Sequence, residues 1–221
     1  MSFWAERVLP ILVEKAGRSR TILELRRRWV PRARGDVLEI GAGSGLNFRF
    51  YDPARVHAVT AIDPSSPLLA RAAARIGEAR VSVALVRAIA EQLPFPDGAF
   101  DTVVMTYTLC SIDDPQRALA ELRRVLRPDG ELLFVEHGLA RDHSTRRRQR
   151  WLTPLWSRVA GGCRLDRDVG AILRAAGFIS DDTTASHHDG PRWLDFTYEG
   201  SAQLDAVTGS KRSAVDPGTT H

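Results

Sequence analysis

The chain has 221 residues, of which 43% are hydrophobic and 26% charged, as in globular proteins; this excludes collagen-like, coiled-coil and wholly disordered chains. The formal net charge is +4 and arginine supplies nearly all of the positive charge, so composition alone says little about binding partners. No apolar run approaches the ~18 residues of a membrane span, and Glu6, Arg7 and Pro10 interrupt the apolar stretch that a secretory signal would need. We therefore expect a soluble, cytoplasmic protein.

Residues 1–34 predict one or two helices rich in tryptophan, leucine and arginine, which we interpret as an N-terminal helical cap. This segment contains the arginine run 26–28, and a second run follows at 146–148. Both runs are short and lack interleaved aromatic residues, so solvated helix faces are favoured over a nucleic-acid surface.

Residues 35–199 alternate between short apolar runs and amphipathic segments, and we predict that they form the main domain. Such runs are typical of parallel strands buried on both faces. The predicted strands are 36–40, 57–62, 81–86, 102–106 and 131–136. Alternation of strands and helices predicts an α/β fold, namely a doubly wound, Rossmann-like, mostly parallel sheet with helices on both faces.

The helices between these strands have recognisable start signals. Ser-Pro at 66–67 predicts a helix over 68–76, and Asp-Pro at 114–115 predicts one that runs to Leu126. Arg-Pro-Asp-Gly at 127–130 then predicts the turn into the next strand.

The C-terminal part is less regular. Residues 144–177 predict helical pieces interrupted near Pro154 and at the glycine pair 161–162, with Gly177 as the last C-cap. Residues 200–221 are small and polar without periodicity, which predicts a disordered tail. The predicted organisation is a cap at 1–34, a domain at 35–199 and a tail at 200–221.

A glycine-rich segment follows the first predicted strand, with Gly41, Gly43 and Gly45 ahead of Asn47. Glycines at this place let the backbone turn tightly and approach a ligand closely. Asp63 ends the second predicted strand, where its carboxylate can accept hydrogen bonds from ribose hydroxyls. The pattern favours a nucleoside-containing cofactor over a glycine turn that only joins strand to helix.

The glycine spacing discriminates between cofactors. A dinucleotide site needs a third glycine where this chain has Leu46. Glu39 precedes the loop and suits a cofactor with a cationic end better than a pyrophosphate.

These residues belong to a set of segments that resembles the class I S-adenosylmethionine-dependent methyltransferases, in the type 11 domain group. The resemblance covers about residues 36–136 and implies S-adenosyl-L-methionine as cofactor and an enzyme that transfers its methyl group. It also implies a seven-stranded sheet with an antiparallel member, for which 179–186 and 193–198 are the expected last pair. The segments are Leu38-Glu39-Ile40-Gly41-Ala42-Gly43-Ser44-Gly45, Ile62-Asp63-Pro64, Ala90-Glu91-Gln92-Leu93-Pro94-Phe95, Phe100-Asp101-Thr102-Val103-Val104 and Leu126-Arg127-Pro128-Asp129-Gly130.

A narrower resemblance links the C-terminal half to the thiol S-methyltransferase group of methyltransferase-like proteins. It is carried by residues 108–112, by Glu136-His137, and by 151–165 with its Gly161-Gly162-Cys163 sequence. Relatives in that group carry a hydrophobic N-terminal membrane anchor, whereas this chain has a short charged helix at 3–15.

The family resemblance implies roles for individual residues. Glu39 and backbone groups near Gly41 and Thr106 are expected to position the methionine part, and Asp63 the ribose. Because Ile89 stands where many family members have an acidic residue, the adenine is expected to be held by backbone groups near Ala90. The expected cofactor-binding residues are Glu39, Gly41, Ala42, Gly43, Gly45, Asn47, Asp63, Pro64, Ser65, Ala90, Glu91, Thr106 and Tyr107.

The expected catalytic residues are His137 and Cys110. A thiol acceptor ionises near pH ~8.5 and can react without a strong protein base. For a hydroxyl or amine acceptor, His137 at the end of the fifth predicted strand is the candidate base; the alternative is a hydrogen-bonded loop residue. Cys110 is predicted to line the acceptor pocket, and the alternative is a buried apolar cysteine.

No metal is expected. Cys110 and Cys163 lie far apart without CxxC spacing, which we interpret as excluding a cysteine-based zinc site. Trp151, Trp156 and Cys163 are candidates for an acceptor lid, although tryptophans at this spacing more often pack a helix onto the core.

The favoured function is methyl transfer to a small-molecule acceptor, with a thiol as the preferred class. Two alternatives stay open: methylation of a lipid head group or quinone-like ring at a membrane surface, and a non-catalytic S-adenosylmethionine-binding module. No nucleic-acid partner is expected, because no motif for holding a flipped base is present. Membrane contact is not favoured and would involve the N-terminal helix. A monomer or homodimer is expected.

Overall fold

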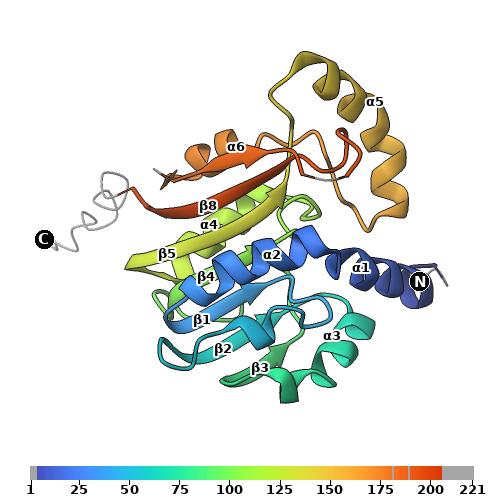
Figure 1. The fold of residues 1–221 in the computed structure, drawn as a ribbon. Coiled ribbons are helices and arrows are strands. Elements are labelled where there is room, and N and C mark those ends of the chain that lie inside the picture. Colours follow the sequence, from blue (N-terminus) through green and yellow to red (C-terminus); the bar gives the residue numbers. More distant parts are fainter. Residues whose placement is uncertain (1–3, 181, 189, 206–221) are drawn as a thin grey trace, which may run out of the picture.

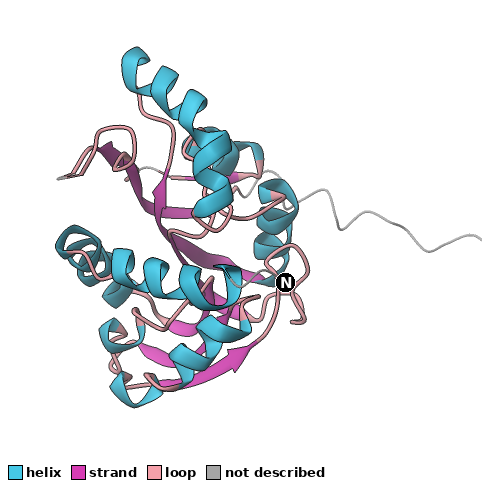
Figure 2. Cartoon of the chain, turned by 90° about the vertical axis from the view of Figure 1, so that its right-hand side faces the viewer, coloured by secondary structure: helices cyan, strands magenta, loops and turns pink. Residues whose placement is uncertain are grey.

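The computed structural model describes residues 4–180, 182–188 and 190–205. They form one twisted sheet with helices on both sides (Figure 1), and Figure 2 shows the strands as a layer between the helices. None of the described helices combines the length and apolar character needed to span a bilayer.

The sheet has the strand order β3-β2-β1-β4-β5-β8-β6, with β7 also paired to β8. Its first five strands pair in parallel, and β8 is antiparallel to β5. The strand order reverses between β1 and β4, so their carboxyl ends form the switch point where such sheets bind ligands. The strands are β1 (Gly35–Ile40), β2 (Val56–Ile62), β3 (Ser82–Val86), β4 (Phe100–Thr106), β5 (Leu126–His137), β6 (Phe178–Ile179), β7 (Thr184–Ser186) and β8 (Thr197–Leu204).

The predicted doubly wound, Rossmann-like α/β fold is confirmed. The strand expected at the far edge of the sheet is split into two short strands, β6 and β7. They pair with opposite ends of β8. The final strand begins at Thr197 rather than at the predicted Trp193.

Two predictions about irregular segments are wrong. Residues 200–204, assigned to the tail, continue β8, where hydrogen bonds to β5 hold a sequence with no strand periodicity. The remaining tail residues 206–221 lie outside the described residues. Residues 127–130, expected to form a turn, belong to β5 as a bulge in the pairing with β4.

The helices pack on two hydrophobic cores, one on each face of the sheet. Leu25 and Trp29 of α2 and Ala72 of α3 belong to one core, whereas Leu122 of α4 and Leu173 of α6 belong to the other. The helical segments are η1 (Trp4–Val8), α1 (Leu9–Gly17), α2 (Arg20–Trp29), η2 (Val30–Arg32), η3 (Phe48–Phe50), α3 (Ser66–Ala73), η4 (Ile76–Glu78), α4 (Pro115–Val125), α5 (His143–Val159) and α6 (Val169–Ala175).

Asp114 caps α4 as predicted, through its hydrogen bond from the amide of Arg117. The cap of α3 is Ser65, one residue earlier than expected. Helix α5 continues through Pro154. Pro154 and Arg150 are both exposed, so water can satisfy the carbonyl that the missing proline N–H leaves free.

Candidate functional site

The glycine loop after β1 adopts a conformation that other residues rarely reach. Gly41, Gly43 and Gly45 have φ angles of 66°, 56° and 75°. A Cβ on Gly41 would overlap the side chain of Thr108, whereas one on Gly43 would meet only the Gly41 carbonyl oxygen, at 3.9 Å. The loop is therefore tightly packed at Gly41 and leaves space at Gly43.

Asp63, at the end of β2, lies directly against this loop and is buried. Its carboxylate oxygens accept hydrogen bonds from the amides of Gly43, at 2.9 Å, and Ser65, at 2.8 Å. Burial raises the pKa of Asp63, and the two amide bonds oppose that rise. Asp63 therefore lies next to the loop, and its predicted contact with a ribose stays a prediction.

Glu39 is buried on β1 just before the loop. Its carboxylate accepts hydrogen bonds from Asn47 Nδ2, at 3.0 Å, and from the Tyr51 hydroxyl, at 2.8 Å. Burial raises the pKa of Glu39 to about 7. This acid therefore changes charge near neutral pH.

Arg26 is a part of the site that the sequence interpretation missed, because the run 26–28 was assigned to a solvated face. Its side chain reaches inward from α2 and donates to Asn47 Oδ1, at 2.6 Å, and to Thr106 Oγ1, at 2.7 Å. The residue is only 8% exposed, and its Nε is buried without a hydrogen-bond partner. Helical spacing was the available signal, since Arg26 lies three residues before Trp29 and so on the same side of the helix.

The loop after β4 forms the other side of the site. Glu136 is buried on β5 and accepts hydrogen bonds from the amides of Thr108, at 2.8 Å, and Cys110, at 3.3 Å. Burial raises the pKa of Glu136 to about 7. Thr108 Oγ1 donates to the carbonyl of Ile40, at 3.0 Å, and so ties this loop to the glycine loop.

Tyr107 begins the same loop with a φ of 58°, unique among the described non-glycine residues. Its ring packs edge-on against the ring of His137, with centroids 4.5 Å apart. Left-handed backbone at a bulky residue stores strain and is concentrated at functional sites. The strained residue therefore sets its aromatic ring against His137 at the end of β5.

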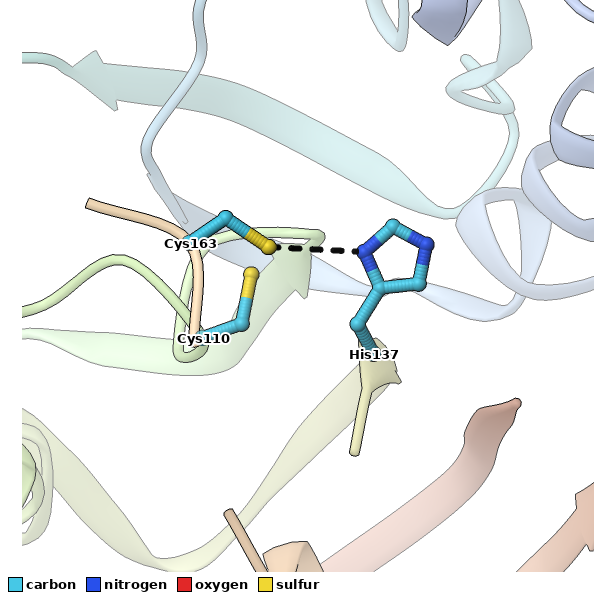
Figure 3. Close-up of side chains that lie close together, drawn as sticks. All are labelled: Cys110, His137 and Cys163. Atoms are coloured by element: carbon cyan, nitrogen blue, oxygen red, sulfur yellow. Dashed lines mark hydrogen bonds between the residues drawn. The ribbon is translucent and has the colours of Figure 1, made fainter. Parts of the chain in front are cut away.

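Cys110, His137 and Cys163 come together beside this loop (Figure 3). Cys163 Sγ lies 3.8 Å from His137 Nδ1, and one ligand atom from each residue lies within 4.8 Å of the others. Both cysteines are buried and free. The contact between the thiols raises the pKa of Cys110 and lowers that of Cys163. The spacing argument against a cysteine metal site does not cover this arrangement, because the residues come from three separate segments.

The two tryptophans suggested as a lid differ in position. Trp156 packs with both cysteines and stacks edge-on against Trp193, with centroids 5.5 Å apart. Trp151 is 79% exposed on α5. Only Trp156 therefore borders the cysteine cluster.

Residues 38–134 match the family model described as "Methyltransferase domain". Thiol S-methyltransferase TMT1A of Homo sapiens is 36% identical over 153 residues, which cover 67% of this chain and 62% of that protein. Phosphatidylethanolamine N-methyltransferase of Cereibacter sphaeroides is 42% identical over 110 residues, covering 49% of this chain and 53% of that protein.

The chain carries an S-adenosylmethionine-dependent methyltransferase domain. The predicted family resemblance is thereby confirmed. The crystal structure of YcgJ from Bacillus subtilis shares the fold, with a TM-score of 0.65 and 20% identity over 82% of this chain and 97% of that one. The chain spans 62% of the length of TMT1A and 59% of human TMT1B.

The residues around the loop fit the methyltransferase domain's cofactor, S-adenosylmethionine. The space at Gly43, the buried acids and the unpartnered Arg26 Nε match its sugar, its cationic groups and its carboxylate in chemical type. A hollow of about 330 Å³ next to this region is lined by Pro64, Arg87, Ala88 and Ile89. By contrast, Glu91 accepts a hydrogen bond from the amide of Asp114 and lies toward α4.

Proposed function

We propose that the protein methylates a small thiol. The observation that carries this proposal is the hydrogen bond from Thr108 Oγ1 to the carbonyl of Ile40. This bond joins the loop after β4, which contains Cys110, to the glycine loop. The acceptor pocket would then open beside the donor site. Human TMT1A, named as a thiol S-methyltransferase, supports the thiol class.

The cofactor supplies an electrophilic methyl group on a sulfonium, and the chain's residues bind and orient it. Glu39 would hold a cationic group, Arg26 the carboxylate and Asp63 the ribose hydroxyls. These assignments follow from charge and burial at three separate positions around one loop. Further proposed contacts come from Gly41, Ala42, Gly43, Gly45, Asn47, Pro64, Ser65, Ala90, Thr106 and Tyr107, whereas Glu91 faces α4 and is left out.

Alignment and a dry environment are what the rest of the site contributes. Leu109 and Ile112 are buried on either side of Cys110 and would exclude water from a reacting sulfur. Arg167 donates to the carbonyl of Leu109 and places a guanidinium beside the loop, where it would favour a thiolate. A hydroxyl or amine acceptor would instead need His137 as a base. Both cysteines are free, which suits a reducing, cytoplasmic setting.

A membrane-held acceptor is the second candidate, and exposed apolar side chains favour it. Ile11 of α1 is 52% exposed, and Leu155 of α5 is 65% exposed, with Trp151 still more accessible. The turn that follows α5 approaches the start of α1, since a Cβ on Gly161 would lie 3.2 Å from the Leu9 side chain. Such a surface could rest on a bilayer next to the acceptor pocket.

Transfer of label from S-adenosylmethionine to a panel of small thiols, phenols and amines tests the proposal. We expect labelled thioethers, and far less label after Asp63→Asn at a cofactor concentration near the wild-type Kd, whereas Asp129→Asn at an exposed position should keep the activity. Label on phenols or amines but never on thiols would overturn the thiol class. Cofactor binding without transfer to any acceptor would instead support a binding module.

Vesicle sedimentation separates the second candidate. A small soluble thiol as the acceptor predicts that the protein stays in the supernatant. Co-sedimentation with vesicles that weakens in Ile11→Ser and Leu155→Ser, together with label in the lipid fraction, would favour the membrane-held acceptor.

A further inference from the structure

We propose that Cys110, His137 and Cys163 bind a zinc ion whose fourth coordination position takes the acceptor thiol. The metal site stands on the geometry of these three residues alone. The use of the fourth position rests on the proposed thiol acceptor.

The distances suit tetrahedral zinc. Zinc–sulfur bonds of ~2.3 Å and zinc–nitrogen bonds of ~2.0 Å place neighbouring ligand atoms about 3.5–3.8 Å apart. Cys163 Sγ and His137 Nδ1 are 3.8 Å apart, and all three ligand atoms lie within 4.8 Å of one another. Figure 3 shows both sulfurs and the imidazole pointing toward a common centre. Side-chain adjustments of about an ångström would complete the geometry.

The backbone holds the ligands in place. The Glu136 carboxylate fixes the amide of Cys110, and the amide of Arg164 donates to the Cys110 carbonyl, at 2.8 Å. Gly162, with a φ of 86°, brings Cys163 close to the other loop, because a Cβ there would lie 3.2 Å from the Ser111 carbonyl oxygen. Supporting contacts of this kind are what orient metal ligands in proteins.

The surroundings also suit bound sulfur. The indole N–H of Trp156 is buried in the same cluster as both cysteines and interacts with the Cys163 sulfur, whose pKa it helps to lower. Metal-bound thiolate is an acceptor for such a donor. Two thiolates would balance the zinc charge, so the buried site would be neutral before the acceptor arrives. A disulfide, in contrast, would leave His137 without a function in the cluster.

Three protein ligands and one open position are the arrangement of catalytic zinc sites. An acceptor thiol that enters this position loses its proton to solvent and binds as a thiolate. The thiolate lone pair forms the new sulfur–carbon bond, while the bond from the methyl carbon to the donor sulfonium breaks and its electron pair stays on that sulfur. Both products are neutral thioethers, and the zinc oxidation state does not change.

Metal content tests the site independently of methyl transfer. The reduced full chain, purified without a histidine tag from zinc-supplemented cells, should contain about one zinc per chain by plasma mass spectrometry. Cys163→Ser and His137→Asn should each lose most of it, whereas His57→Asn, whose side chain is 78% exposed, should keep it. Circular dichroism checks that the variants fold. Wild-type protein that takes up no zinc while both thiols titrate as free would overturn the proposal.

Cobalt substitution tests the fourth position. Co²⁺ should give the visible bands of a tetrahedral site and a thiolate charge-transfer band, both changed by adding a small thiol but not an alcohol. A spectrum that ignores the thiol would overturn acceptor binding at the metal. Zinc bound in a protein that methylates only amines or phenols would refute the thiol proposal and leave the three-residue site intact.

Discussion

The carboxyl edge of the sheet has two halves that are built differently. We name the two halves by their proposed roles. The donor half comprises Glu39, the glycine loop 41–47, Asp63 and Arg26, which reaches the loop from α2. The acceptor half comprises the loop 107–112, His137 and the segment 161–165. The donor half is mainly one continuous loop whose glycines have positive φ angles, beside a strand end. The acceptor half also contains positive φ angles, at Tyr107 and Gly162, but it depends on side chains brought together from three segments.

This difference explains which half sequence motifs reveal. Left-handed φ angles at three loop positions demand glycine, so the function of the donor half is visible in its residue types. A cysteine or histidine is compatible with many environments, and its meaning depends on its neighbours in space. Arg26 shows the same dependence within the donor half, since it reaches Thr106 from a distant helix.

The largest expected effect is a loss of folding stability at Gly41, where the donor half contacts the acceptor half. Gly41→Ala combines a strained φ with overlap against Thr108 of the acceptor half, so it should destabilise the fold by about 3 kcal/mol. Gly98→Ala has a φ of 61° and no neighbour within 4 Å, so it should cost only about 1 kcal/mol. Urea unfolding measures both. Equal losses in the two variants would show that the halves are not locked together at Gly41.

The donor half alone should respond to Asp63→Asn. The loss of charged hydrogen bonds to the ribose should weaken cofactor binding about 100-fold by calorimetry. Zinc content should stay at the wild-type value, because Asp63 belongs to the donor half. Asp129→Asn serves as the matched control at an exposed position. Unchanged affinity in Asp63→Asn would remove this carboxylate from the donor site.

A smaller effect follows from the pKa of Glu39, which burial raises to about 7. Only the ionised acid attracts a cationic group, and its ionised fraction falls as the pH drops through that pKa. Cofactor affinity should therefore weaken about fivefold between pH 7 and pH 6, while the amino group of the cofactor stays protonated. Calorimetry at both pH values measures this change. Glu39→Gln should bind more weakly and lose the dependence; a dependence that survives would belong to another acid such as Glu136.

Much of the fold followed from the sequence. Apolar runs placed the first five strands, and Asp114 marked the start of α4, because burial on both faces and helix capping leave local patterns. The last strand was harder, since β8 is held by pairing with β5 rather than by any periodicity of its own. The sequence also predicted an interruption near Pro154, whereas α5 continues through this residue. The proline is tolerated because it is exposed to water.

The sequence by itself determined the first five strands, the glycine loop with the acid that ends β2, and the family to which the domain belongs. Those features arise from constraints within one strand, one turn or one helix end. The tertiary structure decided the inward position of Arg26, the β8 extension and the meeting of Cys110, His137 and Cys163. These depend on packing between distant segments, and each residue taken alone is compatible with many other surroundings.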